Sequence, residues 1–436
     1  MPADAQRHVI VVGGGFAGVG CVKRLAEHDD VRVTLVDRNN YHQFQPLLYQ
    51  VATSQLASSD IAFSLRKLFR EDENVDVKLG EVASVDPATH SVTLVGGDRI
   101  SGDAVVLAAG SQPNFFHTPG APEHAFPLYS LDDATHLRSR IIAVFEDADR
   151  DPSLIDQGAL NFVVVGGGPT GVELAGALAD LIAETMSVEY RGLAVSAAQI
   201  HLVDLGHTLL GPFSDRAHDY VAKILGRKGV RLHLGVAVTE VGAGHVALAD
   251  GSTIRTRCVV WGGGIMAPAL AAAAGVPQGR GGRIDVQADL TVAGAPGVYA
   301  VGDVANIPSP DGNTHPQLGS VALQSGAWAA DNVLAGFAGA QPKSFHYHDK
   351  GIMAMIGRGA AIAEVGAHRH ELHGVVAFSA WLGVHSALML GVRNRIDAFV
   401  AWGWDNFSSS RGPQVLDRAD VARIDWDEDR TPAPSP

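Results

Sequence analysis

Three glycines near the start of the chain have the spacing of a nucleotide-binding turn. Gly13, Gly15 and Gly18 directly follow the apolar run "HVIVV", and a helix-compatible segment comes after them. Glycine lets backbone turn sharply and approach a ligand closely, and N–H groups at a helix start attract a pyrophosphate. The next apolar run, "VRVTLVD", ends in Asp37, 19 residues after Gly18, where a carboxylate binds a ribose hydroxyl in dinucleotide sites. The set predicts such a site.

The glycine spacing alone is weak evidence, because the chain holds 50 glycines among 436 residues. Random sequence would supply such a match by chance. It does not supply the ordered set of apolar strand, glycine turn, helix, second strand and terminal acid, and this order favours the dinucleotide site.

The same pattern occurs a second time in the chain. Gly166, Gly168 and Gly171 follow the apolar run "NFVVV", and a later run, "QIHLVD", ends in Asp204. Asp204 lies 33 residues after Gly171, so a longer helix or an insertion around "SVEYRGLAVSA" must separate the two. The chain is therefore predicted to carry two dinucleotide sites.

Other buried strands are predicted to end beside these sites. "DAVVLAAG" closes on Gly110 and "RCVVWGGG" on Gly262, while "GVYAVGD" ends in Gly302 and Asp303. Ligands bind at the carboxyl ends of strands in open α/β sheets. Asp303 alone is more typical of an ordinary turn residue after a strand than of a ligand-binding acid. Beside two nucleotide modules, its carboxylate is predicted to accept hydrogen bonds from a polyol chain.

Length, charge and cysteine content limit the classes of protein. A chain of 436 residues suggests two or three domains, and a net charge of −14 without a basic cluster argues against a nucleic-acid partner. Cys21 and Cys258 form no CxxC pair, which indicates a reducing compartment and excludes a redox dithiol. Seven residues before the first strand leave no room for a secretory signal, so a cytoplasmic main body is expected. No metal site is predicted.

The C-terminal part differs in character from the rest. Two strands, in "HYHDKGIMAMIG" and "IAEVG", are predicted before an aromatic-rich helical region, and residues 417–436 are expected to form a disordered tail. Leu372–Val392 has no Asp, Glu, Lys or Arg over 21 positions. Because its histidines, serines and glycines do not suit a spanning helix, the region is interpreted as two amphipathic helices in a membrane interface, the second near Leu388–Asn406. Packing on the core or at a dimer seam is the alternative.

Five longer motifs resemble one family, the type II NADH dehydrogenases. They are "VDRNNYHQFQPLLYQVA", "GGGPTGVELAG", "VYAVGD", "DKGIMAMIGRG" and "AWLGVHSALMLGVRNRI", and the resemblance covers nearly the whole chain. It implies an α/β fold with two Rossmann-like domains and a membrane-associating C-terminal region. The implied order is a discontinuous FAD domain (1–125 and 285–344), an inserted NADH domain (126–284), a C-terminal region (345–416) and the tail (417–436).

The resemblance also assigns each nucleotide to a site. The FAD site would comprise Gly13, Gly14, Gly15, Phe16, Ala17, Gly18, Asp37, Arg38, Val82, Ala109, Gly110, Gly302 and Asp303, with the Val82 backbone near the adenine. The NADH site would comprise Gly166, Gly168, Pro169, Thr170, Gly171, Asp204 and Gly262. A carboxylate at Asp204 would accept from ribose hydroxyls and repel a 2′-phosphate, which favours NADH over NADPH.

Glu173 is the acid expected near the nicotinamide, because the family keeps a glutamate in the matching position. Its implied role is polar gating or proton handling between the donor and acceptor sites. Since Glu173 is placed in the first turn of its helix, the alternative is that it only complements the helix dipole, worth about 0.3–1 kcal/mol at a surface. The sequence leaves both interpretations open.

The acceptor site departs from the family pattern. The family commonly has Ala-Gln and a second Gln four residues after the first, whereas this chain has Gly319, Ser320 and Gln324. A serine hydroxyl cannot reach where an amide would bind a quinone carbonyl. A different quinone, a shifted pose and another acceptor stay open.

The predicted function is oxidation of NADH and reduction of menaquinone or ubiquinone through FAD, without proton pumping. The enzyme would be peripheral, at the cytoplasmic face of the cell membrane, and a homodimer is considered. The alternatives are a soluble NAD(P)H reductase with a non-quinone acceptor, a redox-responsive FAD- and NADH-binding protein, and, less favoured, a monooxygenase-like flavoprotein. Disulfide and sulfide chemistry is disfavoured because it needs a cysteine pair.

Overall fold

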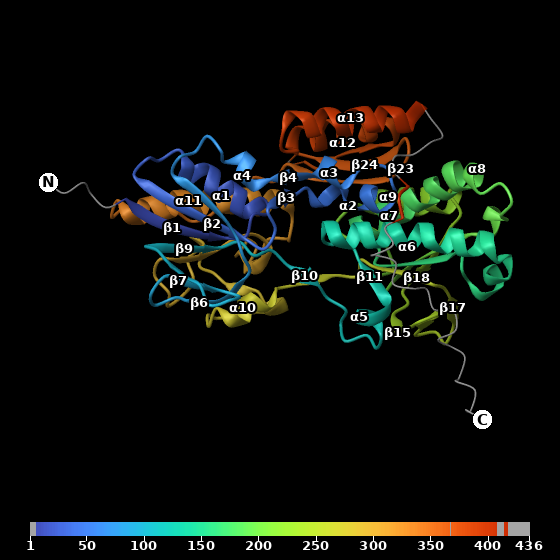
Figure 1. The fold of residues 1–436 in the computed structure, drawn as a ribbon, viewed down its shortest axis with the longest axis horizontal. Coiled ribbons are helices and arrows are strands. Elements are labelled where there is room, and N and C mark those ends of the chain that lie inside the picture. Colours follow the sequence, from blue (N-terminus) through green and yellow to red (C-terminus); the bar gives the residue numbers. More distant parts are fainter. Residues whose placement is uncertain (1–5, 367, 408–413, 417–436) are drawn as a thin grey trace, which may run out of the picture. The chain divides into compact units, whose positions relative to one another are not determined.

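The computed structural model describes residues 6–366, 368–407 and 414–416, and the chain divides into two compact units. Unit 1 is built from 1–43, 62–112 and 265–349, and unit 2 from 44–61, 113–264 and 350–436. Figure 1 labels their elements. Which nucleotide each segment binds, and with it the domain assignment, stays a prediction. The predicted tail, 417–436, lies outside the described residues.

The centre of unit 1 is a five-stranded parallel sheet in the order β21-β9-β1-β2-β5. Its central strand is buried on both faces, since Val9, Ile10 and Val11 are fully inaccessible, as predicted for the first apolar run. The bounds are β1 (Arg7–Val12), β2 (Val31–Asp37), β5 (Val75–Leu79), β9 (Ala104–Leu107) and β21 (Val298–Ala300).

Two helices pack together in unit 1. α1 (Phe16–Ala26) follows β1 directly, and α11 (Gly319–Phe337) lies along it. The smaller elements of the unit are β3 (Tyr41–Gln43), β4 (Ala62–Ser64), α4 (Leu65–Leu68), β19 (Ile265–Met266), α10 (Ala269–Ala273), β20 (Ile284–Asp285), a 3-10 turn (Gly302–Val304) and β22 (Ala305–Asn306). β10 (Gln112–Pro113) lies where the chain passes from one unit to the other.

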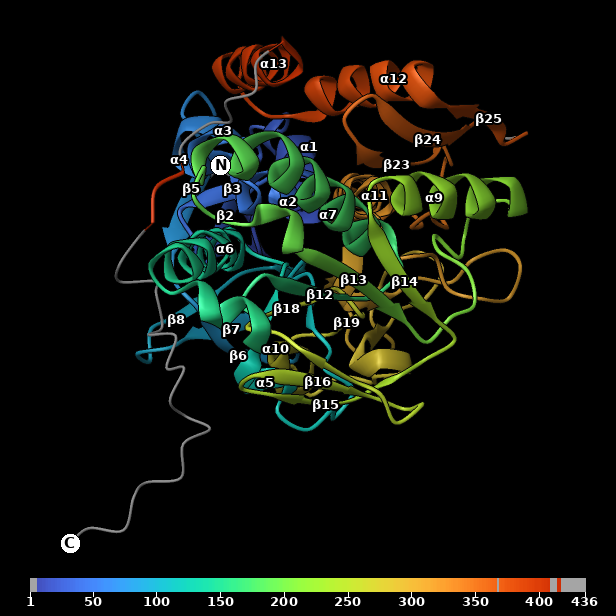
Figure 2. The same ribbon diagram turned by 90° about the vertical axis from the view of Figure 1, so that its right-hand side faces the viewer.

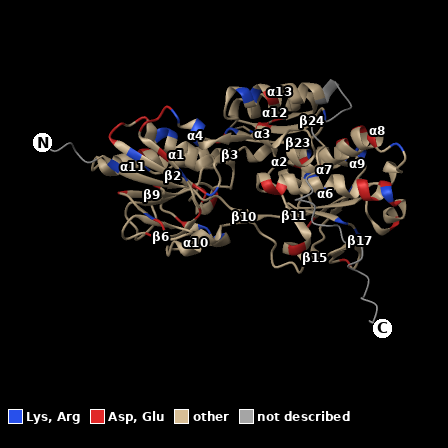
Figure 3. Cartoon of the chain, viewed as in Figure 1, with Lys and Arg blue, Asp and Glu red and all other residues tan. Residues whose placement is uncertain are grey.

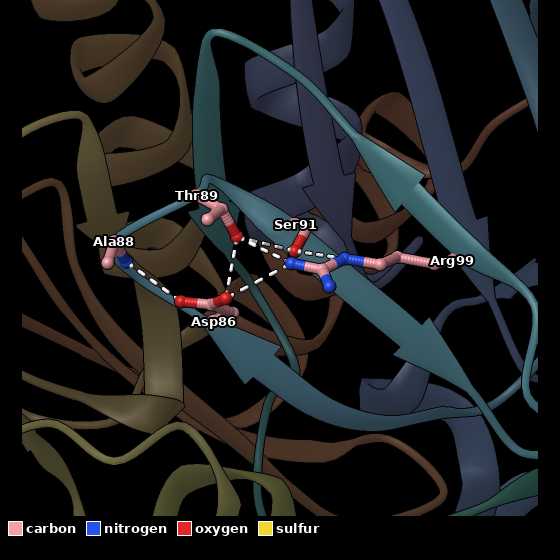
Figure 4. A network of polar contacts seen from close by, with 5 residues as sticks. All are labelled: Asp86, Ala88, Thr89, Ser91 and Arg99. Carbon is pink, nitrogen blue, oxygen red and sulfur yellow. Dashed lines mark hydrogen bonds and ion pairs between the residues drawn. The ribbon is translucent and has the colours of Figure 1, made fainter.

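A small antiparallel sheet completes unit 1. It consists of β6 (Val82–Asp86), β7 (Ser91–Leu94) and β8 (Arg99–Ser101). A polar network fixes the turn between β6 and β7 (Figure 4): Asp86 accepts from the Ala88 N–H at 3.1 Å and from the Thr89 hydroxyl at 2.6 Å. The Arg99 guanidinium donates to Asp86, Thr89 and Ser91 at 2.6–3.1 Å. Because Arg99 belongs to β8, the network also ties this strand to the turn.

Unit 2 repeats the same plan. Its parallel sheet has the order β11-β18-β12-β13-β14, and a three-stranded antiparallel sheet, β15-β16-β17, accompanies it. The bounds are β11 (Ala125–Pro127), β12 (Asn161–Val165), β13 (Gln199–Asp204), β14 (Val230–Leu234), β15 (Val238–Gly242), β16 (His245–Leu248), β17 (Thr253–Arg255) and β18 (Cys258–Trp261). The prediction of two Rossmann-like modules is therefore confirmed.

The helical connection after β12 is long, as the spacing to Asp204 predicted. α7 (Pro169–Asp180) continues into a π-helix (Leu181–Met186) and α8 (Ser187–Glu189) before β13 begins. The other helices of unit 2 are α2 (Leu48–Ala52), α3 (Ser58–Ile61), α5 (Ala121–His124), α6 (Leu131–Arg150) and α9 (Asp215–Arg227).

The C-terminal part of unit 2 is a three-stranded antiparallel sheet followed by two helices. The elements are β23 (Gly351–Gly357), β24 (Ala360–Val365), β25 (His370–His373), α12 (Gly374–Leu388) and α13 (Val392–Phe407). α12 packs on β24, and α13 packs beside α12 (Figure 2). The two predicted strands and two predicted helices are confirmed, although the second helix begins at Val392 rather than near Leu388. Among the described residues, no helix is both long and apolar enough to cross a bilayer.

Candidate functional site

The first glycine turn of unit 1 is a cradle that only glycine permits. Gly13 has a φ of +107°, and a Cβ there would lie 2.3 Å from the carbonyl oxygen of Ala108. A Cβ on Gly18 would lie 1.7 Å from the Gly13 carbonyl oxygen. In contrast, nothing lies within 4 Å of a Cβ built on Gly15. Gly15 is the N-cap residue of α1, and no side chain caps this helix start with a hydrogen bond. This open space at a helix start fits a pyrophosphate.

Asp37 lies at the end of β2 and is turned toward this glycine turn. Its two oxygens accept from the N–H groups of Gly14 at 2.5 Å and Asn39 at 2.6 Å. Burial raises its pKa. The neighbouring Arg38 is exposed, and Val82 is buried at the start of β6.

His42 and Phe16 lie beside the first glycine turn. The buried His42 ring contacts the Gly14 carbonyl oxygen through Nδ1 at 2.9 Å, and Phe16 lies edge-on to it with centroids 5.1 Å apart. Sequence reasoning named Phe16 but missed His42. The signal was present, since His42 lies inside the motif "NNYHQF" after the first acid.

Two further predicted FAD segments meet beside this turn. β9 and β21 are neighbouring parallel strands, so their carboxyl ends bring Ala109 and Gly110 close to Gly302 and Asp303. The Ser111 hydroxyl donates to Asp303 Oδ2 at 3.1 Å.

The backbone of Asp303 makes a second contact, with the loop that precedes α11. The Gln317 amide donates to the Asp303 carbonyl oxygen at 3.0 Å, and burial raises the pKa of the Asp303 carboxyl. The structure therefore fixes this acid at the carboxyl edge of the sheet.

The second glycine turn, in unit 2, has the same construction. Gly166 has a φ of +112°, and a Cβ there would lie 2.4 Å from the Gly262 carbonyl oxygen. A Cβ on Gly171 would lie 1.8 Å from the Gly166 carbonyl oxygen, while the space around Gly168 is open. Pro169 and Thr170, both exposed, begin α7.

Asp204 is turned toward the second turn as Asp37 is toward the first. Its oxygens accept from the N–H groups of Gly167 and Gly206, the latter at 2.5 Å. Because β12, β13 and β18 are adjacent and parallel, Gly166, Asp204 and Gly262 all lie at one sheet edge. The predicted NADH residues thus form one cluster.

Glu173 is not where the sequence placed it. α7 begins at Pro169 and has no acid in its first turn, so Glu173 lies in the second turn, and only 9% of it is exposed. Its Oε1 accepts from the backbone N–H of Met355 in β23 at 3.1 Å. Burial raises its pKa to about 8. The first-turn position, on which the surface helix-dipole alternative was based, is therefore wrong.

A chain of polar contacts connects the surroundings of Glu173 to α13. The Tyr49 hydroxyl donates to the Met355 sulfur at 3.2 Å, and the Gln50 amide donates to the Tyr49 oxygen at 3.0 Å. Trp402 Nε1 donates to Gln50 Oε1 at 2.7 Å. Sequence reasoning quoted "LLYQVA" as a family motif but assigned these side chains no role.

The predicted acceptor residues share the first turns of α11 in unit 1. Gly319 is exposed, and the Ser320 hydroxyl lies 2.8 Å from the Tyr347 hydroxyl. Both ends of the Gln324 amide bind the backbone of His348: Oε1 accepts from its N–H at 2.9 Å, and Nε2 donates to its carbonyl at 3.1 Å. Tyr347 was not predicted.

The two cysteines lie apart from this chemistry. Cys21 is in α1 of unit 1 and Cys258 is in β18 of unit 2, and neither is exposed. Burial raises the pKa of each thiol to about 12. Since the thiolate is the reactive form, these cysteines suit a packing role.

Comparison with known proteins agrees with this architecture. Residues 7–326 match the pyridine nucleotide-disulphide oxidoreductase family. The type II NADH:quinone oxidoreductase Ndh of Mycobacterium tuberculosis is 35% identical over 94% of this chain and 90% of its own length. The type II NADH:quinone oxidoreductase of Haemophilus influenzae is 27% identical over 83% and 87%.

A solved structure shows the same fold. NDH2 from Plasmodium falciparum in complex with NADH superposes with a TM-score of 0.85 at 19% identity, covering 94% of this chain and all of that one. Together with the two glycine turns and their acids, these findings establish that the chain belongs to the type II NADH:quinone oxidoreductases, within the pyridine nucleotide-disulphide oxidoreductase family.

Proposed function

We propose that this chain is a flavoenzyme that oxidises NADH and reduces a membrane quinone without pumping protons. One observation carries the proposal: a single chain holds two glycine turns, each of which only glycine permits and each of which has its own carboxylate. Two nucleotides can therefore be bound at once. The family membership gives FAD and NADH as these nucleotides.

FAD would be held by unit 1. Gly13–Gly18 would bind the pyrophosphate, Asp37 the adenosine ribose, Asp303 the ribityl chain and the Val82 backbone the adenine. Arg38, Ala109, Gly110 and Gly302 would line the site. The open space at Gly15 and the position of Asp303 at the carboxyl edge of the sheet, where Ser111 donates to it, support this assignment.

NADH would be held by unit 2. Its pyrophosphate would lie at the start of α7, over Gly166–Gly171, and Gly262 would line the site. Asp204 would accept from the ribose hydroxyls and repel a 2′-phosphate, so NADH is the preferred donor.

When bound, the flavin supplies the redox chemistry, accepting hydride from nicotinamide and passing electrons to quinone. The protein orients the reactants and excludes water. Glu173 would handle a proton between the donor and acceptor sites. Its raised pKa, about 8, keeps it protonated near neutral pH, which suits an acid that gives and regains a proton.

The quinone, menaquinone or ubiquinone, would bind at the start of α11, beside Gly319, Ser320 and Gln324. This turn lies next to predicted flavin residues, since a Cβ on Gly319 would be 3.5 Å from the Phe16 ring. Because Ser320 stands where the family commonly has a glutamine, the quinone would bind differently here from the family pattern.

The enzyme would bind the cell membrane peripherally, at its cytoplasmic face, and the exposed apolar side chains of α12 and α13 support the membrane binding. α12 carries no charged residue (Figure 3). Apolar side chains that are 41–71% exposed cover both helices: Val375, Val376, Val384, Leu388, Val392, Ile396, Phe399, Val400 and Trp404. Large exposed apolar side chains gathered on two neighbouring helices are typical of an interaction site, and lipid would cover them.

Vesicle flotation with the full chain tests membrane binding. The variant Phe399→Glu/Val400→Glu should float less than the unaltered chain, whereas Val95→Glu, at a valine of unit 1 that is 66% exposed, should float as the unaltered chain does. Equal flotation of all three would contradict the proposal.

Steady-state turnover tests the reaction itself. The purified protein should contain FAD and consume NADH continuously when a short-chain quinone is supplied. Stoichiometric NADH consumption that then stops would indicate a redox-responsive binding protein instead. Continuous turnover with other acceptors but with no quinone would indicate a soluble reductase.

A further inference from the structure

The buried carboxyl group of Glu173 belongs to a closed ring of contacts. The ring is built from five elements of unit 2: α2, α7, β23, α12 and α13. Hydrogen bonds of 2.7–3.2 Å run through five of its residues, Glu173, Met355, Tyr49, Gln50 and Trp402. Trp381 of α12 is the sixth residue, and it closes the ring between Trp402 and Glu173.

Trp381 is completely buried, and aromatic rings hold it on two sides. It stacks on the His385 imidazole with centroids 3.9 Å apart and meets the Trp402 indole at 65° with centroids 5.8 Å apart. α12, which carries Trp381, packs on β24 and β23, and α7, which carries Glu173, packs on β23 as well. The indole is therefore fixed beside the strand to which Glu173 binds.

The indole N–H of Trp381 lacks a hydrogen bond of ordinary geometry. Nε1 is buried, and among the described residues no acceptor meets the distance and angle of such a bond. The acceptor that it approaches is the Glu173 carboxyl, because the Trp381 side chain lowers the pKa of this acid as a hydrogen-bond donor does. A buried donor without a full partner costs free energy, so an arrangement that completes the bond is expected in the working molecule.

Glu173 needs different numbers of donors in its two protonation states. Burial raises its pKa to about 8, against the opposing effect of the Met355 N–H and the Trp381 indole. The protonated acid is neutral and has an O–H of its own, so burial destabilises it little. The carboxylate can only accept, and in a buried site each of its oxygens needs a donor. Oε1 has the Met355 N–H at 3.1 Å, and Trp381 is the second donor at hand.

We propose that the Trp381 indole N–H forms a full hydrogen bond to Glu173 when this acid gives up its proton, and thereby stabilises the ionised carboxylate. Trp381 is a positioning residue, which keeps its own hydrogen and acts on the reaction only through Glu173. The proton that Glu173 releases is replaced from solvent, so one proton is still consumed for each NADH oxidised and quinone reduced. The part of Glu173 in proton handling comes from the proposed function, and this inference rests on it.

Other titratable groups near the ring can be told apart from Glu173. Two of them lie in the ring or beside it: Tyr49 of α2 and His385 of α12. Burial lowers the pKa of His385 to about 4, although its Nδ1 lies 2.8 Å from the Trp381 carbonyl oxygen, so this histidine stays neutral above pH 7. Asp180, two turns further along α7, is paired with Lys228. A change in the surroundings of Trp381 near pH 8 therefore does not come from His385.

Infrared titration of the holoenzyme tests the proposal. The carbonyl-stretch band that Glu173→Gln lacks reports the protonated form of this acid, and it should lose half its intensity near pH 8. Trp381→Phe keeps an aromatic ring but removes the N–H, and the midpoint should rise by about one to two pH units, as expected for the loss of a hydrogen bond to a charged group. Trp402→Phe is the matched control, because its N–H binds Gln50, and it should titrate as the unaltered protein does.

A second measurement needs no change at Trp381 and decides the case if Trp381→Phe does not fold. The chain has six tryptophans, whose indole N–H groups give separate nuclear magnetic resonance signals after ¹⁵N labelling. One signal should move downfield in step with the infrared band, because its hydrogen bond strengthens as the carboxylate forms. This movement should be absent in Glu173→Gln.

Two results would overturn the inference and leave the proposed function intact. One is a Trp381→Phe midpoint equal to that of the unaltered protein, and the other is a set of indole signals none of which follows the Glu173 band. A purified protein that holds FAD but reduces no quinone would refute the proposed function and with it the proton-handling role of Glu173. The infrared midpoints would still decide whether Trp381 binds the ionised acid.

Discussion

The carboxylate of Glu173 and the backbone N–H of Met355 are 3.1 Å apart and join the helix of the second glycine turn to strand β23. The two residues are 182 positions apart in the chain. A second contact of the same kind occurs two turns later, where Asp180 accepts from the Arg358 N–H at 2.7 Å. The helix at the predicted NADH site is therefore fixed along the C-terminal sheet.

Glu173 should make the stability of the protein depend on pH. Its pKa is 4.5 ordinarily and about 8 in the folded state, so between these values the folded chain holds a proton that the unfolded chain has released. Stability should then fall as pH rises through this window, by up to about 1.4 kcal/mol per pH unit. Glu173→Gln should lose this contribution to the slope. Denaturant midpoints measured across the window check it.

Glu123→Gln is the control for that slope, because Glu123 is an exposed glutamate of the same unit. Its unfolding midpoints should follow those of the unaltered protein at every pH. A Glu173→Gln variant with the unaltered slope would show that Glu173 is ionised in the folded protein.

The two glycine turns should be separable by substitution. Gly13→Ala places a Cβ 2.3 Å from the Ala108 carbonyl oxygen and should abolish FAD retention, whereas Gly166→Ala should retain FAD and raise the KM for NADH at least about tenfold. Flavin absorbance per chain and NADH kinetics measure the two effects.

Gly226→Ala is the control for these substitutions, since it lies in α9 with open space around its Cβ. It should leave both properties unchanged. Loss of FAD in Gly166→Ala, with FAD retained in Gly13→Ala, would reverse the assignment of the two sites.

Asp204 should decide the choice between NADH and NADPH. Asp204→Asn keeps an oxygen for the Gly167 N–H but removes the charge that repels a 2′-phosphate. The preference in kcat/KM for NADH over NADPH should fall about tenfold, equivalent to about 1.4 kcal/mol. Asp156→Asn, at an exposed acid of unit 2, should keep the original preference. Equal efficiency of both donors in the unaltered enzyme would show that Asp204 does not face the ribose.

Two tryptophans of α13 should differ sharply in their effect on stability. Trp402 is 5% exposed and donates to Gln50, which is 1% exposed, so Trp402→Phe leaves a buried amide oxygen without this donor. The free energy of unfolding should fall by about 1–3 kcal/mol. Trp404 is 63% exposed, and Trp404→Phe should stay within about 0.5 kcal/mol. Equal effects of the two substitutions on the unfolding midpoint would contradict this account of the contact.

The two glycine turns could be predicted because the strand, turn and helix that form each of them are close in sequence. Strand, turn and helix follow one another between His8 and Ala26, and the geometry at Gly13 and Gly18 depends on neighbours in that stretch and on one adjacent strand. The acids follow from the next strand of the same sheet. Local pattern and global fold agree here, so the sequence is informative.

Contacts between distant segments could not be predicted in the same way. The partners of Glu173 and Ser320, which are Met355 and Tyr347, are fixed by how β23 and the Lys343–His348 segment pack on helices far earlier in the chain. β25 was also missed, because "HELH" is mostly polar and has a single apolar residue, Leu372, to pack against the alanines of β24. Neither periodicity nor composition contains this information.

Sequential stopped-flow mixing tests the central claim, that electrons pass from NADH through flavin to quinone in this chain. NADH should bleach the absorbance of the bound flavin, and a menaquinone or ubiquinone analogue added next should restore it within one turnover. A purified protein that takes up no flavin, or a bleached flavin that neither quinone reoxidises, would contradict the account.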